Sequence, residues 1–255
     1  MSERPLILIT NDDGYAAKGL RVLMECAADY GDVVVMAPDR NASGLSHSFT
    51  SGRPLRVNDI ERREGVVAYS CDGTPVDCVK LAIEHFCSRK PAVVLSGINH
   101  GSNSSVNVLY SGTMGAVIEA STYGFNAIGF SLTDHAKDAN FDYCVPYIRQ
   151  ILSTTLANGL PEGVSLNVNF PIGQINGLRV CHEAKAHWAD SFEHRVDPYG
   201  RSYWWLTGRF ICDDDNPDTD ERALAEGYAS VVPTQPDYTS YEALPLLKKI
   251  YGVDR

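Results

Sequence analysis

Short apolar runs, each followed by a segment of helical periodicity, constrain the fold of this sequence most. The first run, Leu6–Thr10, is apolar at four consecutive positions and ends at Asn11. Continuous apolar runs of this length are typical of strands buried on both faces, and strands that alternate with helices form a parallel sheet covered on both sides. We therefore predict an α/β fold. The expected strands are Leu6–Thr10, Asp32–Ala37, Ala92–Leu95, Ala127–Ser131 and Val164–Phe170, and the expected helices are Lys18–Tyr30, Pro75–Phe86, Gly112–Thr122, Phe141–Leu156 and Tyr241–Tyr251.

Composition narrows the class of protein. A chain of 255 residues with 44% hydrophobic residues is long enough to bury one large core. Its formal net charge of −10 argues against a binding surface for a nucleic-acid duplex, which would be basic. No apolar stretch has the length of a membrane span or signal peptide, and the seven cysteines form no CxxC pair. We expect a cytoplasmic protein with reduced thiols and no membrane partner.

The sequence changes character after about Arg179. Helical periodicity fades there, and all three tryptophans, at positions 188, 204 and 205, lie beyond it. We expect residues 1–184 to form the α/β catalytic core, 185–232 a β-rich extension and 233–255 a C-terminal segment with a helix. Within the extension, the acidic stretch Asp213–Glu221 is expected to be a solvated loop. Exposed aromatic hairpins of this kind are enriched at protein interfaces.

Two adjacent carboxylates are the strongest chemical signal. Asp12 and Asp13 directly follow the first predicted strand, and ligands of a doubly wound sheet bind beyond the carboxyl ends of its strands. Neighbouring carboxylates repel each other unless a cation lies between them, and hard oxygen ligands suit Mg²⁺ or Mn²⁺. The alternative is that one aspartate caps a helix or forms an Asx turn at Gly14. We interpret the pair as the centre of a metal site.

Two further loops and a helix start are expected at the same edge of the sheet. Ser43 and Asn99 can add neutral oxygen ligands, although both residue types are also common in turns. The segment Tyr110–Thr113 precedes a predicted helix, where N–H groups and hydroxyls bind anions, unless a residue there is a simple N-cap. Carboxylates that hold a metal beside an anion-binding helix start suggest phosphate chemistry. None of the seven histidines forms an HExxH or HxH pair, so a zinc site is not indicated.

Eight short motifs occur in order along nearly the whole chain. They are NDDG (11–14), APDRNASG (37–44), GTPVDCVKLA (73–82), SGINHGSN (96–103), YSGT (110–113), DPYGRSYWW (197–205), TDERALAEGYASVVP (219–233) and DYTSYEAL (237–244). NDDG alone is a weak signal, but the ordered set is specific, and with it the chain resembles the SurE family of metal-dependent 5'(3')-nucleotidases. His47, Asn107 and Gln235 depart from the usual family pattern.

The resemblance implies a three-layer, Rossmann-like core with a mostly parallel sheet, plus a C-terminal β-rich extension. It also implies release of phosphate from nucleoside 5'- and 3'-monophosphates by a metal-activated water, which Asp12 or Asp13 helps to deprotonate. Its implied assembly is a homodimer or homotetramer whose extensions are exchanged between subunits, with Asp213–Glu221 as a candidate hinge. The implied ligands of one divalent cation per subunit, Mn²⁺ or Mg²⁺, are Asp12, Asp13, Ser43 and Asn99, and the implied phosphate site is Asn103, Ser111, Gly112 and Thr113.

Three alternative functions are considered. A haloacid-dehalogenase-like phosphatase separates its two aspartates by one residue, whereas here they are adjacent. A receiver-like regulatory module is about half this length and needs an acceptor aspartate in the region where Asn99 stands. A non-catalytic nucleotide-binding protein would differ from an active enzyme only by subtle changes in its sequence. No segment resembles a dedicated base reader, so we expect loose base preference.

Overall fold

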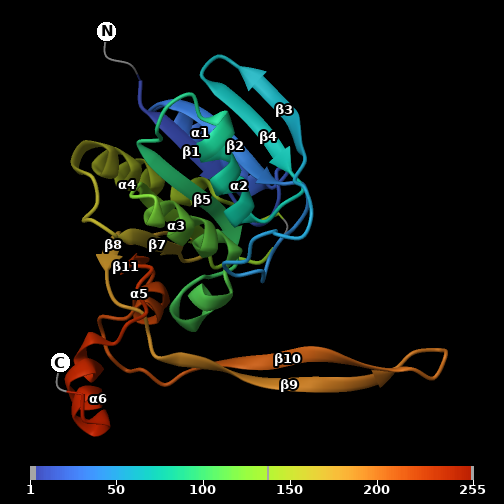
Figure 1. Ribbon diagram of the computed structural model, residues 1–255, viewed down its shortest axis with the longest axis vertical. Coiled ribbons are helices and arrows are strands. Elements are labelled where there is room, and N and C mark those ends of the chain that lie inside the picture. The colour runs from blue at the N-terminus through green and yellow to red at the C-terminus, as the bar shows by residue number, and fades with distance from the viewer. Residues whose placement is uncertain (1–3, 137, 254–255) are drawn as a thin grey trace.

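A single large sheet forms the centre of the molecule in the computed structural model, which describes residues 4–136 and 138–253 (Figure 1). Its strands are β1 (Leu6–Thr10), β2 (Asp32–Pro38), β3 (Val57–Arg63), β4 (Val66–Cys71), β5 (Val93–His100), β6 (Asn126–Leu132), β7 (Ser165–Phe170), β8 (Leu178–Val180) and β11 (Ala229–Thr234). They are arranged in the order β3-β4-β2-β1-β5-β6-β7-β11-β8. All neighbours from β4 to β7 are parallel, whereas β3 and β11 run antiparallel to β4 and β7.

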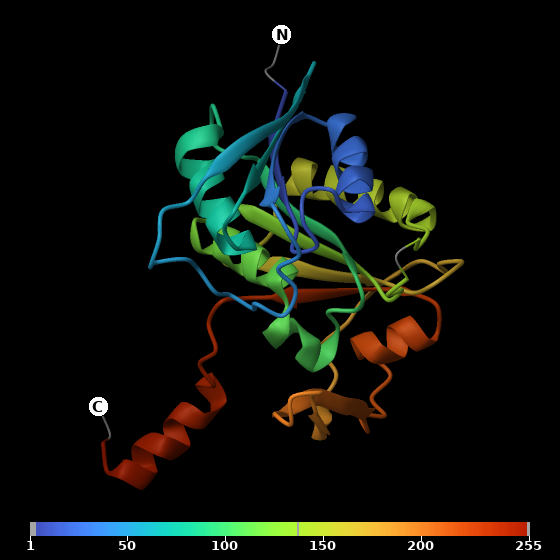
Figure 2. The same cartoon turned by 90° about the vertical axis from the view of Figure 1, so that its right-hand side faces the viewer.

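Helices cover both faces of the sheet, as expected for a three-layer α/β fold (Figure 2). Successive residues of a strand point to opposite faces, so a continuously apolar strand needs cover on both sides. Strand β1 shows this arrangement, because Ile7 and Ile9 belong to one core cluster and Leu6 and Leu8 to the other. The first cluster includes residues of α1 (Lys18–Ala28) and α4 (Val145–Asn158), and the second includes residues of α2 (Pro75–Leu81) and α3 (Gly112–Thr122).

Shorter elements complete the chain. None of the helices in the described ranges is both long and apolar enough to cross a bilayer, and all seven cysteines are free thiols. The shorter elements are the π-helical turn η1 (Ala82–Phe86), the 3₁₀ turns η2 (Ser105–Tyr110), η3 (Asp142–Cys144) and η4 (Tyr241–Ala243), and the helices α5 (Asp220–Ala225) and α6 (Leu244–Tyr251).

A long antiparallel hairpin projects from the body of the molecule (Figure 1). Its strands are β9 (Ala186–Val196) and β10 (Ser202–Cys212), which pair along their full length. The rest of the expected extension, 185–232, returns to the body, because α5 follows the hairpin and β11 enters the main sheet between β7 and β8. The projecting part is therefore shorter than the sequence suggested.

The acidic stretch Asp213–Glu221 is largely exposed up to Asp218, as expected of a solvated loop, but Thr219 and Asp220 near its end are buried. Asp220 is 0% exposed and begins α5. Its carboxylate accepts hydrogen bonds from the backbone N–H groups of Ser105, at 2.7 Å, and Ala184, at 2.9 Å. A carboxylate tolerates burial when donors of this kind replace water. Asp220 thus ties α5 to η2 and to the chain that leads into the hairpin.

Candidate active site

The turn after β1 leaves the carboxylates of Asp12 and Asp13 available for partners outside the turn. Asn11 closes this turn: its Oδ1 accepts a hydrogen bond from Gly14 N, at 3.2 Å, and its Nδ2 donates to Gly14 O, at 3.0 Å. The Asx-type turn is therefore made by Asn11 and not by Asp12 or Asp13. Neither aspartate is needed to hold its own loop in place.

Asp12 lies against the start of α3. It is 3% exposed, and its two oxygens accept hydrogen bonds from Thr113 Oγ1, at 2.6 Å, and Thr113 N, at 3.1 Å. A helix N-terminus favours negative charge, so α3 stabilises this carboxylate. Burial raises the pKa of Asp12 above its usual range; the hydrogen bond from the Thr113 side chain opposes this, and the charge of Asp13 adds to it.

The other residues of the helix start have different roles. Ser111 is the N-cap of α3, and its Oγ accepts a hydrogen bond from Met114 N at 3.0 Å. Gly112 packs so closely on Asp12 that an added Cβ would lie 2.9 Å from Asp12 Cβ. Of the predicted phosphate residues, Gly112 and Thr113 therefore lie against Asp12, and Ser111 and Thr113 already hydrogen-bond within the protein.

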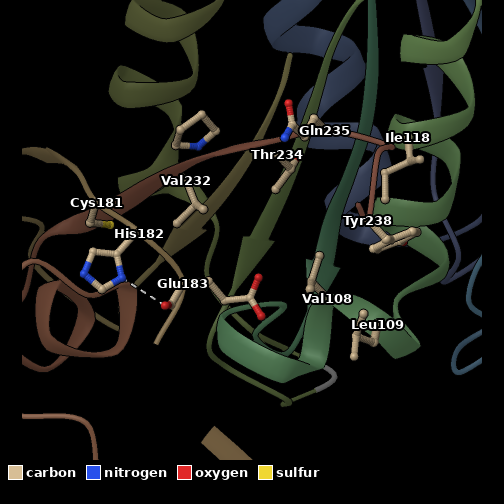
Figure 3. Close-up of a pocket in the computed structure, with 11 residues that line it drawn as sticks. Val108, Leu109, Ile118, Cys181, His182, Glu183, Val232, Thr234, Gln235 and Tyr238 are labelled. Carbon is tan, nitrogen blue, oxygen red and sulfur yellow. Dashed lines mark hydrogen bonds between the residues drawn. The ribbon is translucent and has the colours of Figure 1, made fainter. Parts of the chain in front are cut away.

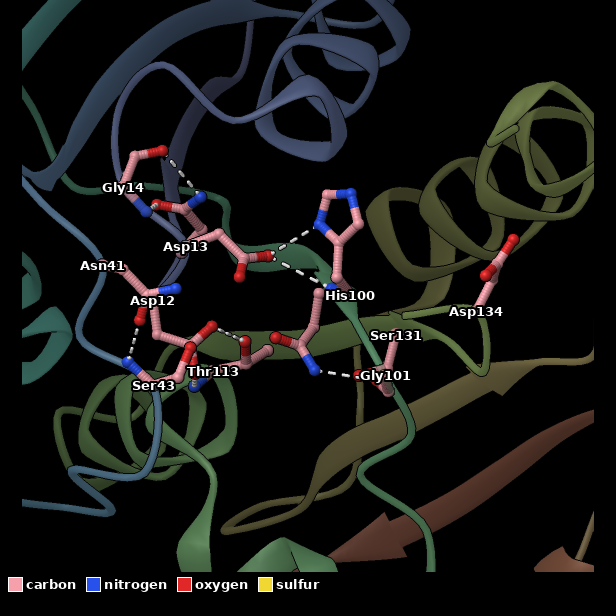
Figure 4. Close-up of polar contacts among 12 residues, drawn as sticks. Asp12, Asp13, Gly14, Asn41, Ser43, His100, Gly101, Thr113, Ser131 and Asp134 are labelled. Carbon is pink, nitrogen blue, oxygen red and sulfur yellow. Dashed lines mark hydrogen bonds and ion pairs between the residues drawn. The ribbon is translucent and has the colours of Figure 1, made fainter. Parts of the chain in front are cut away.

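Asp13 contacts His100, a histidine that the sequence analysis did not place among the site residues. Its Oδ2 lies 3.1 Å from the backbone N of His100 and 3.1 Å from His100 Nδ1, and both side chains are largely buried (Figure 4). His100 is the last residue of β5. The signal available in the sequence was its position in SGINHGSN, directly after the proposed ligand Asn99.

Ser43 and Asn99 reach the site from the ends of two other strands. The loop after β2 is held by a hydrogen bond from Ala42 N to Asp12 O, at 2.7 Å, which places the exposed Ser43 beside the acidic pair (Figure 4). Asn99 is 8% exposed and follows an irregularity in the pairing of β5 with β6, a feature that re-aims side chains. Its Nδ2 donates to Gly101 O at 2.8 Å, which leaves Oδ1 for another partner.

These four side chains fit a hard divalent cation. They offer two carboxylates, one amide oxygen and one hydroxyl, which is the chemistry that Mg²⁺ and Mn²⁺ prefer. Over the described ranges, neither carboxylate forms an ion pair with lysine or arginine, so the charge of the adjacent pair is left for a cation. The same part of the chain holds no group of three or more His, Cys, Asp or Glu side chains suited to a metal.

A pair of buried asparagines, which the sequence analysis missed, holds Asn103. Asn169 Oδ1 accepts a hydrogen bond from Asn103 N, and Asn167 Nδ2 donates to Asn103 O, each at 2.8 Å. The Asn103 side chain itself donates to Ser131 Oγ at 2.8 Å. Asparagines two positions apart in the otherwise apolar strand β7 were the available signal, because a buried amide is costly unless it is hydrogen-bonded.

A cavity of about 410 Å³ lies between η2, the chain after β8 and the chain at the end of β11 (Figure 3). Its walls include Val108, Ile118, Val232 and Tyr238, with Glu183 as the only carboxylate among its described lining residues. None of the predicted metal or phosphate residues lines this cavity. It lacks the paired carboxylates that distinguish the site at the end of β1.

The fold and site together define an α/β protein of Rossmann-like form, with an acidic, oxygen-rich site at the carboxyl ends of its parallel strands. The family model for the survival protein SurE matches residues 7–190. The chain belongs to the SurE family, as the resemblance in its motifs predicted.

Relatives and a solved structure agree with this assignment over almost the whole chain. The chain is 49% identical to the 5'-nucleotidase SurE of Cytophaga hutchinsonii, over 96% of each protein, and 50% identical to that of Christiangramia forsetii, over 94% of each. It matches the crystal structure of the SurE protein from Aquifex aeolicus with a TM-score of 0.83 and 34% identity, over 97% of this chain and 100% of the other. The predicted fold class is confirmed.

Proposed function

We propose that this protein is a divalent-metal-dependent phosphomonoesterase that releases phosphate from nucleoside 5'- and 3'-monophosphates by attack of an activated water. The observation that carries the proposal is the convergence of Asp12 and Asp13 with the start of α3, where Thr113 Oγ1 lies 2.6 Å from Asp12 Oδ1. The relatives named above are called 5'-nucleotidases. The 3' activity is inferred because the residues proposed for the site would bind only the metal and the phosphate.

The residues of the site have distinct roles in this mechanism. Asp12 and Asp13 would hold one Mg²⁺ or Mn²⁺ per subunit, with Ser43 and Asn99 as neutral ligands. Such an ion supplies Lewis-acid chemistry, lowering the pKa of water and offsetting phosphate charge. Asp12 or Asp13 accepts the proton of the attacking water. The phosphate is bound by Asn103, Ser111, Gly112 and Thr113, where the helix start stabilises the developing negative charge.

Phosphate release from nucleotides tests this proposal. The purified protein is assayed with AMP, CMP, GMP and UMP and with 3'-AMP, in Mg²⁺, in Mn²⁺ and after removal of metal with EDTA. We expect release from all of them, with 5' substrates differing by less than about tenfold, or about 1.4 kcal/mol in barrier. EDTA should abolish release and added metal should restore it. Activity that survives EDTA, or activity on sugar phosphates alone, would contradict the proposal.

We also propose that the protein forms a homodimer or homotetramer through the β9–β10 hairpin. One face of this hairpin carries Phe192 and Trp204, each at least 60% exposed. Apolar side chains on one exposed face favour association with another chain. Exchange between subunits would place the hairpin of one subunit near the site of its partner.

Light scattering tests the assembly. A single chain has a mass of 27.9 kDa, and we expect a multiple of this mass at micromolar concentration. The deletion variant should remove residues 187–211 only, because excision through residue 232 would also remove most of β11 from the main sheet. Replacing 187–211 with a short Gly-Ser bridge should give a monomer with weakened activity. A monomeric full-length protein would refute the oligomer.

A further inference from the structure

A second cavity, distinct from the one in Figure 3, lies between η2 and the end of the hairpin nearest the body of the molecule. We infer that this second cavity binds the nucleotide base in the proposed nucleotidase site. This inference rests on the proposed function and adds the part of the substrate that the metal and phosphate residues do not touch. The cavity has a volume of about 410 Å³, within the range of small-molecule pockets. Its walls come from η2 (Asn107 and Tyr110), from β9 (Trp188 and Asp190) and from residues 206–208 of β10.

The position of this cavity links it to the phosphate site. Tyr110, in its wall, directly precedes Ser111, the N-cap of α3. The carbonyl of Tyr110 also accepts a hydrogen bond from Ser46 N, at 3.2 Å, in the loop that carries Ser43. The cavity wall and the proposed phosphate site are therefore formed by consecutive residues of the chain, Tyr110 and Ser111. The base is the part of the substrate that can extend into the cavity.

The cavity presents aromatic surface held in place by the fold. Trp188 is 40% exposed and Tyr110 54% exposed. The Trp188 ring is fixed by a hydrogen bond from Nε1 to Asn107 Oδ1, at 2.9 Å, and by an edge-on contact with Phe210, with ring centroids 5.6 Å apart. Rings that are rigid before binding lose little entropy when a base stacks on them, and stacking accepts every base. This explains loose base preference without a dedicated sequence motif.

The negative charge of the cavity lining favours the nucleotide base over the phosphate as the group bound there. Asp190 contributes a carboxylate, and the described lining contains no lysine or arginine. A phosphate would be repelled here, whereas the exocyclic amino groups of adenine, cytosine and guanine can donate to Asp190. Gly208 lies opposite Asp190 in the hairpin. A Cβ at this position would lie 3.1 Å from Asp190 Oδ1 and 3.4 Å from Trp188 Cε3, so glycine keeps the cavity open.

Two disruptive variants, one conservative control variant and a substrate without a base test the inference. Ribose 5-phosphate keeps the sugar and phosphate of AMP but lacks the ring. Trp188→Ala should lower the ratio of kcat/KM for AMP to that for ribose 5-phosphate about tenfold, mainly through KM. Gly208→Val should lower the same ratio by filling the cavity. Trp188→Phe keeps an aromatic ring but loses the bond to Asn107, and should largely retain the ratio.

Binding of adenosine, measured by calorimetry without metal, keeps the test independent of catalysis. We expect adenosine to bind the full-length protein and to bind Trp188→Ala about tenfold more weakly. Equal losses for AMP and ribose 5-phosphate in both variants would show a structural role and overturn the inference. Unchanged adenosine affinity in Trp188→Ala, or no adenosine binding by the unmodified protein, would overturn it too. If no substrate releases phosphate but adenosine binds as expected, the proposed function fails and the base subsite stands.

Discussion

Asp13→Asn is expected to abolish phosphate release, lowering kcat/KM by about a thousandfold or more, while the fold is retained. In the proposed site two negative charges would hold the cation, and an amide removes one of them. Lewis-acid stabilisation by a metal is worth several kcal/mol, and each 1.36 kcal/mol is tenfold in rate. The measurements are phosphate release and calorimetric titration of the protein with Mn²⁺, which should bind much more weakly.

The stability of this variant separates loss of charge from loss of structure. The charge of Asp13 contributes to raising the pKa of Asp12, so its removal relieves a repulsion in the metal-free protein. The asparagine oxygen can still accept the hydrogen bond from His100 N. The thermal midpoint in EDTA should therefore be equal to or above that of the unmodified protein. Asp59→Asn, on an exposed side chain of β3, is the matched control and should leave activity unchanged. Full activity in Asp13→Asn with normal Mn²⁺ binding would refute the metal site.

Gly112→Ala should be nearly as damaging although it adds only one methyl group. The new Cβ would lie 2.9 Å from Asp12 Cβ, closer than real Cβ contacts, and 3.0 Å from Asp12 Oδ2, which is also unusually tight. Asp12 is buried and held by Thr113, so either the carboxylate or the start of α3 must shift. A displacement of about 1 Å at a reacting centre can cost about a hundredfold in rate, and overpacking costs about 1–3 kcal/mol of stability.

The sign of the stability change in Gly112→Ala is diagnostic, because helix propensity alone predicts a gain in stability. Alanine is favoured over glycine within a helix by about 1 kcal/mol, so a gain in stability with normal activity would show that the close contact is absent. The assays are kcat/KM for AMP and urea unfolding. Gly52→Ala is the control, since a Cβ at that position meets no atom within 4 Å.

Two of the strands that the sequence analysis did not predict, β3 and β8, lie at the edges of the sheet, whereas a third, β4, is a buried strand inside it. Strand β3 is exposed at six of its seven positions and carries the charged run Glu61–Arg63, so it has no apolar run to detect. Strand β8 is only three residues long. Such strands are held by pairing with a neighbour and not by their own pattern, as β3 is by β4. The end of β5 was missed for another reason, because Ser96–His100 is polar and Gly-containing yet still belongs to the strand.

Local pattern and residue chemistry by themselves determined the α/β class, the buried strands and the acidic pair. A strand covered on both faces must be apolar throughout, and adjacent carboxylates at its end predict a cation site, so neighbouring residues alone carry both signals. The tertiary structure alone decided that Thr113 supports Asp12, that His100 contacts Asp13, and that the hairpin base forms a cavity with η2. The first two contacts join residues 101 and 87 positions apart. Periodicity reports which face of an element is buried, but the packing of distant elements determines what that face meets.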